Sequence, residues 1–301
     1  MNEGRAIEPV GVERRADRQV QRRLVSMARF AWRQPLGAVG LVTILASIAV
    51  AVFANWITPY DPNTCIADDR LMGPSLRHLL GTDHQGRDMF SRIVFGTRIS
   101  LMVSFFSIGI GTGGGYLLGI ISGYVGGKFD MLFQRLMDAL LAFPSLLLAL
   151  VMVAVLSPGL DKVIIAIAVT LLPRAARVSR GVALSVKENV YVDAARVIGA
   201  SSLRIMIRHV LPNSTAPFLI LASVSLGMAI LTEASLSYLG LGVPPPHASW
   251  GQMMSGAAKD FSQIAPWLII FPGVAIGVLV LGFNLFGDTL RDIWDPRLRG
   301  R

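Results

Sequence analysis

Long charge-free runs alternate with short charged segments along this chain. After a polar segment over 1–34, an apolar run extends from 35 to 57 without a charged residue. This run exceeds the roughly 20 apolar residues that a helix needs to cross a bilayer, and it begins too late for a cleaved signal peptide. The pattern therefore indicates an all-α membrane protein that folds as a six-helix transmembrane bundle. The five further spans are predicted over 99–127, 139–157, 163–173, 214–232 and 261–287.

Two of these spans are irregular. Pro144 interrupts the third, and the fourth has only 11 residues, ending just before Arg174. A helix that short crosses the membrane only if its charged end extends into the cytoplasm and neighbouring helices cover it. The fourth run is retained as a span on that condition.

Composition supports membrane insertion. Hydrophobic residues make up 53% of the 301 residues and charged residues only 16%, whereas soluble domains carry about 25% charged residues. The net charge of +9 could suggest nucleic-acid binding. The arginines, however, lie at the ends of apolar runs and do not alternate with aromatic residues, so nucleic acid is not an expected partner.

The distribution of basic residues predicts the orientation. Residues 1–34 hold eight arginines against four acids and residues 174–213 hold seven basic residues against two acids, whereas residues 58–98 are balanced. Because cytoplasmic loops are enriched in Lys and Arg, both termini and the 174–213 loop are predicted to be cytoplasmic. The predicted parts are a cytoplasmic N-terminal segment (1–34), a first membrane helix (35–57), an external loop (58–98), a membrane core (99–287) with the loop 174–213, and a cytoplasmic tail (288–301).

Nothing in the sequence predicts catalysis or a metal site. The four histidines lack the paired spacing of metal ligands, and the lone Cys65 cannot form an internal disulfide. A phosphate-binding Gly-rich loop followed by Lys and Ser or Thr is also absent from the sequence. If ATP drives this protein, the nucleotide is expected to bind another chain.

A glycine ladder marks the second span. Gly111, Gly115, Gly119 and Gly123 recur at every fourth position, which lines one helix face with small residues and lets another backbone approach closely. The ladder predicts tight packing, either within the bundle or along a translocation path or subunit interface.

A spaced motif lies in the basic segment 174–213. Its residues are Asp193, Ala194, Ala195, Gly199, Arg208, His209, Leu211 and Pro212. Small side chains at 194 and 195 would let a partner approach, and Gly199 can end a helix in the left-handed conformation. Ser201 and Ser202 are good N-caps for a second helix, which Pro212 either stops or joins to the next span. The alternative is an ordinary helix–turn–helix between two spans.

The spacing of this motif resembles the coupling loop of importer permeases that are driven by an ATP-binding cassette (ABC). The pattern of that family is an acid followed by Ala-Ala, three residues, Gly, nine residues, Ile, one residue and Leu-Pro. This chain keeps the spacing throughout. It has Asp193 where Glu is frequent in the family, and His209 where the general pattern has Ile.

Further stretches resemble the peptide-and-nickel branch of these permeases, and the resemblance covers almost the whole chain after about residue 20. They include Pro59-Tyr60-Asp61-Pro62, Leu80-Gly81-Thr82-Asp83, Gly86-Arg87-Asp88, Ala142-Phe143-Pro144-Ser145, Leu239-Gly240-Leu241-Gly242, Ser249-Trp250-Gly251 and Asp295-Pro296-Arg297. In that branch Arg208-His209-Val210-Leu211-Pro212-Asn213 is a usual end of the loop, so His209 fits. The chain is similar to the second, C-type, permease of a dipeptide or oligopeptide importer.

The resemblance implies a multi-pass subunit of a complex in the bacterial inner membrane, with a cytoplasmic coupling helix. A homologous second permease would complete the pore in the membrane lipid, two cytoplasmic ATPases would bind ATP and magnesium, and an extracytoplasmic substrate-binding protein would deliver cargo. No cofactor is expected in this chain. The loop over about 190–210 would transmit the motion of the ATPases, and the Gly- and Pro-rich segment 239–251 would fold over the outer mouth.

Di- or oligopeptides are the predicted cargo. The expected substrate path is polar and uses Ser235, Ser237 and Asn284, with Glu233 near the amino end of a peptide. Nickel chelates, glutathione and opine- or sugar-like solutes are the alternatives within the same importer class. Scattered histidines argue against a bare metal substrate, because nickel favours convergent imidazoles.

A secondary transporter without an ATPase partner is the alternative from a different class. Such a carrier would need coupling-ion sites or paired broken helices near the bilayer midplane. Pro144 and Pro272 could bend helices, but they do not lie in matched repeats.

Overall fold

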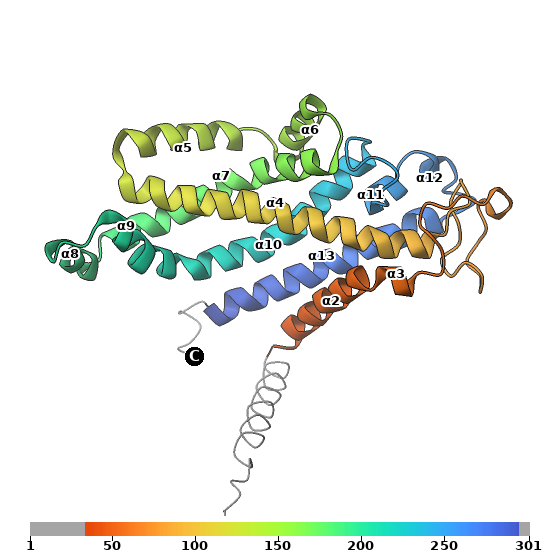
Figure 1. The fold of residues 1–301 in the computed structure, drawn as a ribbon, viewed down its shortest axis with the longest axis horizontal. Coiled ribbons are helices and arrows are strands. Elements are labelled where there is room, and N and C mark those ends of the chain that lie inside the picture. The colour runs from red at the N-terminus through yellow and green to blue at the C-terminus, as the bar shows by residue number, and fades with distance from the viewer. Residues whose placement is uncertain (1–33, 295–301) are drawn as a thin grey trace, which may run out of the picture.

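The computed structural model describes residues 34–294, so the predicted N-terminal segment over 1–33 and the tail over 295–301 lie outside the described residues. The described part is almost entirely helical and contains no strand beyond an isolated bridge between Thr82 and Asp88. Its long helices run side by side along the long axis of the molecule, and the short helices gather at the two ends (Figure 1).

Five long helices build the bundle, and shorter elements connect them. The elements are α2 (Pro35–Val52), α3 (Ala54–Ile57), η1 (Ala67–Asp69), α4 (Met89–Val125), α5 (Gly127–Leu141), α6 (Ser145–Leu156), α7 (Leu160–Lys187), α8 (Val190–Val197), α9 (Ser202–Ile205), the π turn η2 (Met206–Val210), α10 (Leu211–Tyr238), α11 (Trp250–Met253), α12 (Ala257–Asp260) and α13 (Trp267–Trp294).

Within the described residues, four helical segments are long and apolar enough to cross a membrane, namely α2, α4, the continuous helix Ser202–Tyr238 and α13. The bent pair α5–α6 would make a fifth. The all-helical membrane fold predicted from the sequence is confirmed, whereas the count of six spans is not. The predicted fourth span lies in α7, which continues through Arg174 and Arg180 to Lys187 and is too charged to join this group.

The third span, predicted over 139–157 with an interruption at Pro144, is divided in the structure. The chain breaks between α5 and α6, whose axes are bent by 94°. Pro144 explains the break, because it lacks a backbone N–H and disfavours helical geometry at the residue before it. Other boundaries also shift: Arg174–Lys187 is helix rather than loop, α10 continues to Tyr238, and α13 covers Trp267–Trp294 instead of 261–287.

The glycine ladder packs α4 directly against α7. A Cβ atom on Gly111 would lie 2.3 Å from the carbonyl oxygen of Ala168, and one on Gly115 would lie 2.3 Å from that of Leu172. Cβ atoms on the next two glycines would meet Ala176 and Arg180 in the same way, at 2.2 and 2.8 Å from their carbonyl oxygens. The glycines therefore serve a backbone-to-backbone contact inside this chain, as such ladders do between membrane helices.

Candidate functional site

Helix α8 ends in the turn that the sequence predicts. Gly199 has a φ of +82°, in the left-handed region. Its N–H donates to the carbonyl of Arg196 at 2.9 Å, and the N–H of Ala200 donates to the carbonyl of Ala195 at 3.0 Å. These bonds satisfy carbonyls at the end of α8. The predicted role of Gly199 as a helix terminator is confirmed.

The second helix starts as predicted but does not stop at Pro212. The Ser201 hydroxyl accepts a hydrogen bond from the N–H of Arg204 at 3.4 Å, which caps α9. From there α9, η2 and α10 run on as one continuous helix. The prediction left open whether Pro212 stops this helix or begins the next span, and the structure places it in the first turn of α10.

A π turn accommodates the proline. Proline cannot donate a hydrogen bond to the preceding turn, and its ring crowds the carbonyl four residues earlier. Over Met206–Val210 the helix widens, and the N–H of Leu211 donates to the carbonyl of Met206. The side-chain amide of Asn213 donates to the carbonyl of His209 at 2.7 Å. The wide turn lets one helix connect the motif to the membrane span.

Residues 190–210, here named the α8–α9 unit, are anchored to the bundle. Val192 and Ala195 are buried in a cluster with Tyr116 and Tyr124 of α4. Residues of α7 and the π turn complete this cluster, and the Tyr116 hydroxyl donates to the carbonyl of Leu211 at 3.0 Å. The α8–α9 unit therefore packs as one body with the adjoining ends of α4, α7 and α10.

His209 has a specific contact in this unit. Its ring lies against Tyr191 of α8, with 5.7 Å between the ring centroids. The side-chain amide of Asn213 also donates to the Tyr191 hydroxyl at 3.4 Å. The residue that departs from the general Ile pattern thus holds α8 against the beginning of α10.

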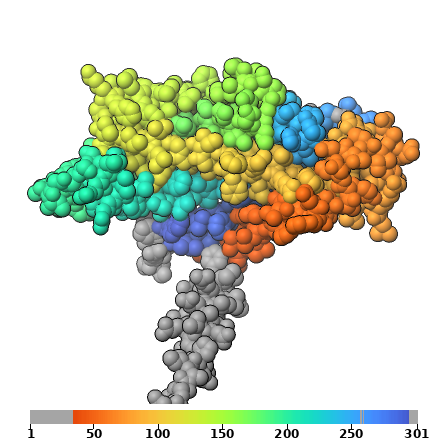
Figure 2. Space-filling view, in the orientation of Figure 1, coloured from red at the N-terminus to blue at the C-terminus, as the bar shows by residue number. Residues whose placement is uncertain are grey.

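The outward face of the α8–α9 unit carries apolar side chains and the small side chain of Ala194. Val197 and Ile198 are 87% and 83% exposed, and Ala194 is exposed beside an Asp193–Arg196 ion pair of 2.7 Å. Val190, Leu203 and Ile207 add exposed apolar side chains, and Arg208 and Pro212 are also exposed. Figure 2 shows the unit projecting from one end of the molecule. An apolar patch with a charged rim is typical of a protein interaction surface.

The residues predicted for the substrate path do not form one site. Glu233 is fully buried, and its carboxylate accepts hydrogen bonds from Ser237 at 2.8 Å, Ser249 at 2.7 Å and Ser100 at 3.4 Å. These bonds join α10 to α4 and to the residue that precedes α11. Glu233 and Ser237 therefore lie together in the interior of the bundle.

Ser235 and Asn284 lie elsewhere. Ser235 lines a largely apolar cavity of about 470 Å³ between α10, α11 and α13, and its hydroxyl donates to the carbonyl of Leu231. Asn284 is exposed on α13, close to Gly227 of α10. The assignment of these four residues to a substrate path stays a prediction.

A larger cavity, which was not predicted from the sequence, lies beside the α8–α9 unit. It has a volume of about 790 Å³ and lies between α7, α10 and α13. Its polar residues are Arg174, Asn213, Asp288 and Arg291. All four lie at the ends of apolar runs in the sequence, and this shared position is the feature from which their proximity could have been predicted.

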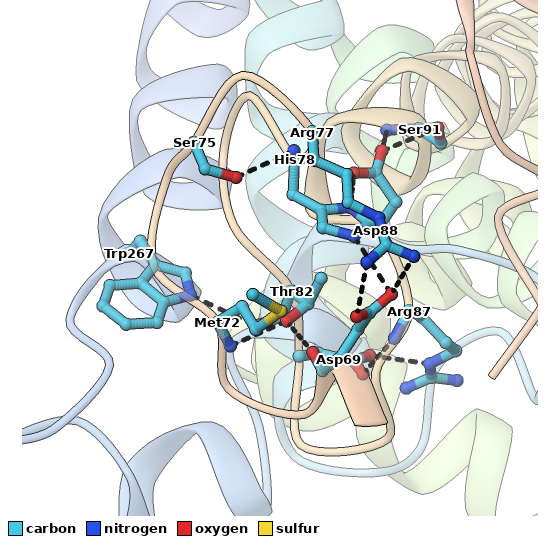
Figure 3. A network of polar contacts seen from close by, with 11 residues as sticks. Asp69, Met72, Ser75, Arg77, His78, Thr82, Arg87, Asp88, Ser91 and Trp267 are labelled. Atoms are coloured by element: carbon cyan, nitrogen blue, oxygen red, sulfur yellow. Dashed lines mark hydrogen bonds and ion pairs between the residues drawn. The ribbon is translucent and has the colours of Figure 1, made fainter. Parts of the chain in front are cut away.

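A polar network holds the segment before α4, at the end of the molecule opposite the α8–α9 unit (Figure 1 and Figure 3). His78 lies between two carboxylates, with its Nδ1 2.9 Å from Asp88 and its Nε2 3.3 Å from Asp69. Arg77 pairs with Asp69 at 3.0 Å, and the Trp267 indole donates to the carbonyl of Thr82 at 3.1 Å. These contacts fix the segment before α4 in place and connect it to α13.

Apolar spans, a packed bundle and a projecting helical unit define a multi-pass membrane protein. Residues 115–300 match the model of the binding-protein-dependent transport system inner membrane component. Residues 26–74 match the N-terminal TM domain of oligopeptide transport permease C. The chain belongs to the family of binding-protein-dependent transport permeases, which confirms the resemblance drawn from its motifs.

Several relatives are similar to this protein over almost the full chain. A putative peptide transport system permease protein of Brucella suis biovar 1 is 45% identical over 276 residues, covering 92% of this chain and 93% of the relative. A dipeptide transport system permease protein of Alkalihalophilus pseudofirmus is 43% identical, covering 89% and 88%. A glutathione transport system permease protein of Escherichia coli O6:K15:H31 is 44% identical over the same shares. These relatives are named as permease proteins of transport systems.

Proposed function

We propose that this permease forms half of the pore of an ATP-driven importer for di- or oligopeptides. The observation that carries the proposal is the α8–α9 unit, whose motif spacing matches a coupling loop and whose exposed face is apolar. The names of the relatives support peptides as cargo. Glutathione is the second candidate, because a relative named for glutathione transport is equally similar.

The complex that we infer has four kinds of component. This chain pairs with a homologous permease, two cytoplasmic ATPases bind ATP and magnesium, and an extracytoplasmic binding protein delivers the peptide. The α8–α9 unit and both termini face the cytoplasm, and residues 58–98 face outward. The basic segments 1–34 and 174–213 support this orientation.

The packing supports a mechanism for coupling. ATP-driven closure of the ATPases would push on the exposed face around Ala194. Because Val192 and Ala195 pack against α4, and Tyr116 holds the start of α10, the push would move the ends of α4, α7 and α10 together. That movement would change the cavity of about 790 Å³ between α7, α10 and α13. Nucleotide and peptide would thus bias one two-state element from opposite sides of the membrane.

The test is Ala194→Arg in the reconstituted complex, measured as uptake of labelled di- and tripeptides and as peptide-stimulated ATP hydrolysis. The bulky charge would prevent close approach of the ATPase, so both signals should be lost while the permease still inserts in the membrane. Ala67→Arg is the matched control, because Ala67 is exposed in the short helix η1 at the other end.

Three results would contradict parts of the proposal. Full transport by Ala194→Arg would exclude the α8–α9 unit as the docking surface. Uptake that needs neither ATP nor a binding protein would favour a secondary transporter. Loss of glutathione uptake alone, with di- and tripeptide uptake unchanged in cells lacking the gene, would replace the cargo and leave the importer class intact.

A further inference from the structure

A polar cavity lies at the end of the molecule away from α8, where the segment before α4 meets the segment around α11 (Figure 1). Its volume is about 290 Å³. Charged walls come from Asp83, Arg87 and Arg92, and α11 contributes Gln252. This cavity is separate from the α8–α9 unit and from the cavity beside that unit.

Arg92 is the unusual member of the wall. Its side chain is only 3% exposed, and its Nη1 donates to the carbonyl of Pro62 at 3.0 Å. Its Nε, however, is buried without a hydrogen-bond partner. Buried donors are nearly always paired, and an unpaired one on a charged group is costly. The guanidinium thus lines the cavity with hydrogen-bonding capacity that no group among the described residues uses.

The carboxylate of Asp83 does not accept a hydrogen bond from Nε of Arg92, because other donors already occupy it. Its Oδ1 accepts the N–H groups of Gln85 at 2.8 Å and Arg87 at 3.0 Å, and its Oδ2 accepts Nε of Arg87 at 2.6 Å. The distance from this Oδ2 to Nε of Arg92 is 3.9 Å, beyond a hydrogen bond. One carboxylate thus faces two guanidinium groups.

His84 does not alter this balance of charge. Burial holds the pKa of its imidazole below the usual range, and the charges of Arg87 and Arg92 lower that pKa further against the opposing effect of Asp83. The ring is therefore neutral at pH 7. The charged wall keeps a surplus of one positive charge, carried mainly by Arg92.

We propose that this cavity binds a small solute through a single carboxylate group that pairs with the guanidinium of Arg92. One surplus positive charge matches a monoanion, and a charge-assisted pair with a guanidinium is among the stronger hydrogen bonds. Met89 and Leu268 supply apolar wall for a short carbon skeleton. The volume lies at the lower limit of small-molecule sites, which limits the solute to roughly the size of an amino acid or dipeptide.

The inference goes beyond transport, because it assigns binding to the permease itself in the absence of a binding protein. The experiment uses the full-length chain in lipid nanodiscs and saturation-transfer NMR with N-acetylglycine as probe. N-acetylglycinamide, which has nearly the same shape without the charge, is the matched neutral probe. We expect saturable transfer to N-acetylglycine and none to the amide.

Variants locate the site. Arg92→Gln should weaken binding of N-acetylglycine roughly tenfold or more, because it removes a hydrogen bond to a charged group. Arg87→Gln should weaken it as well, since it frees Asp83 to pair with Arg92. Arg77→Gln removes the same charge from an exposed side chain outside the cavity and should leave binding unchanged.

A second variant covers the case in which Arg92→Gln does not fold. Gln252→Glu places a like charge in the cavity wall without removing a buried ion and should also exclude N-acetylglycine. Equal binding of the acid and the amide, or unchanged binding in Gln252→Glu, would overturn the proposal. Tighter binding of inorganic phosphate than of N-acetylglycine would overturn the assignment to a monoanionic carboxylate. If binding is overturned in this way while peptide uptake persists, the proposal for this cavity fails and the proposed transport function is retained.

Discussion

At the scale of single residues, Gly199 is required for its backbone conformation and not for lack of space. Its φ is +82°, yet a Cβ atom at this position would meet no other atom within 4 Å. The left-handed conformation costs most residues about 1–2 kcal/mol, whereas Asn tolerates it better. The constraint is therefore local, which is why the sequence alone could predict it.

This constraint separates two substitutions. We expect Gly199→Leu to strain or redirect the turn after α8 and to lower peptide-stimulated ATP hydrolysis severalfold, since a strain of about 1 kcal/mol changes an equilibrium about fivefold. Gly199→Asn should retain most of the activity. Hydrolysis by the reconstituted complex is the measurement, and equal loss in both variants would mean that size rather than conformation matters at this position.

Glu233 illustrates what local sequence could not predict. The sequence shows only that it lies near the end of an apolar run, whereas in the structure three hydroxyl groups surround its carboxylate in the interior. Two of them, on Ser100 and Ser249, come from residues 133 and 16 positions away. Such an environment depends on how α4 and the segment before α11 pack on α10, and no local pattern encodes it.

The buried carboxylate leads to a second residue-scale prediction. Glu233→Ala should leave the hydroxyls of Ser237 and Ser249 without their acceptor and destabilise the chain by about 1–3 kcal/mol. Thermal unfolding in detergent measures this loss, and Ser235→Ala is the control, because its hydroxyl bonds only within its own helix turn. A changed KM for peptide uptake with unaltered thermal stability would instead favour a role of Glu233 in the substrate path.

At the scale of helices, the apolar pattern predicted which segments are helical better than where they bend or end. Hydropathy located α2, α4, α10 and α13, because each contains a long apolar run. It did not show the 94° bend between α5 and α6, although the sequence already indicated an interruption at Pro144. It also ended the fourth span just before Arg174, although α7 continues beyond this residue. Arg180, further along α7, donates two hydrogen bonds to Asp130 of α5, at 2.7 and 2.6 Å, which join the two helices.

The contact between α4 and α7 gives a prediction with a built-in control. A Cβ atom on Gly115 would lie 2.3 Å from the carbonyl oxygen of Leu172, so Gly115→Ala must push the two helices apart. Overpacking of this kind costs about 1–3 kcal/mol. Gly114→Ala meets nothing within 4 Å and should be neutral or stabilising by up to about 1 kcal/mol, because Ala favours helix over Gly. Thermal unfolding of the two variants is the measurement, and equal midpoints would contradict the packing role of the ladder.

At the scale of the whole molecule, the two ends of the bundle carry different chemistry. One end presents the apolar face of the α8–α9 unit, and the other carries the polar network around His78 and the cavity at Arg92. The sequence could point to the α8–α9 unit, because the residues of its motif lie close together along the chain. It did not predict the cavity, since Arg92 and Gln252 are brought together only by the fold.

The orientation of these two ends in the membrane is the last prediction. Cys65 is exposed in the segment before α4, which the balance of charge predicts to lie outside. A membrane-impermeant maleimide should therefore label Cys65 in intact cells. In a Cys65→Ser background, Arg204→Cys lies on the exposed face of α9 and should stay unlabelled until the membrane is opened. Labelling at position 204 from outside would reverse the topology and, with it, exclude the α8–α9 unit as the contact for cytoplasmic ATPases.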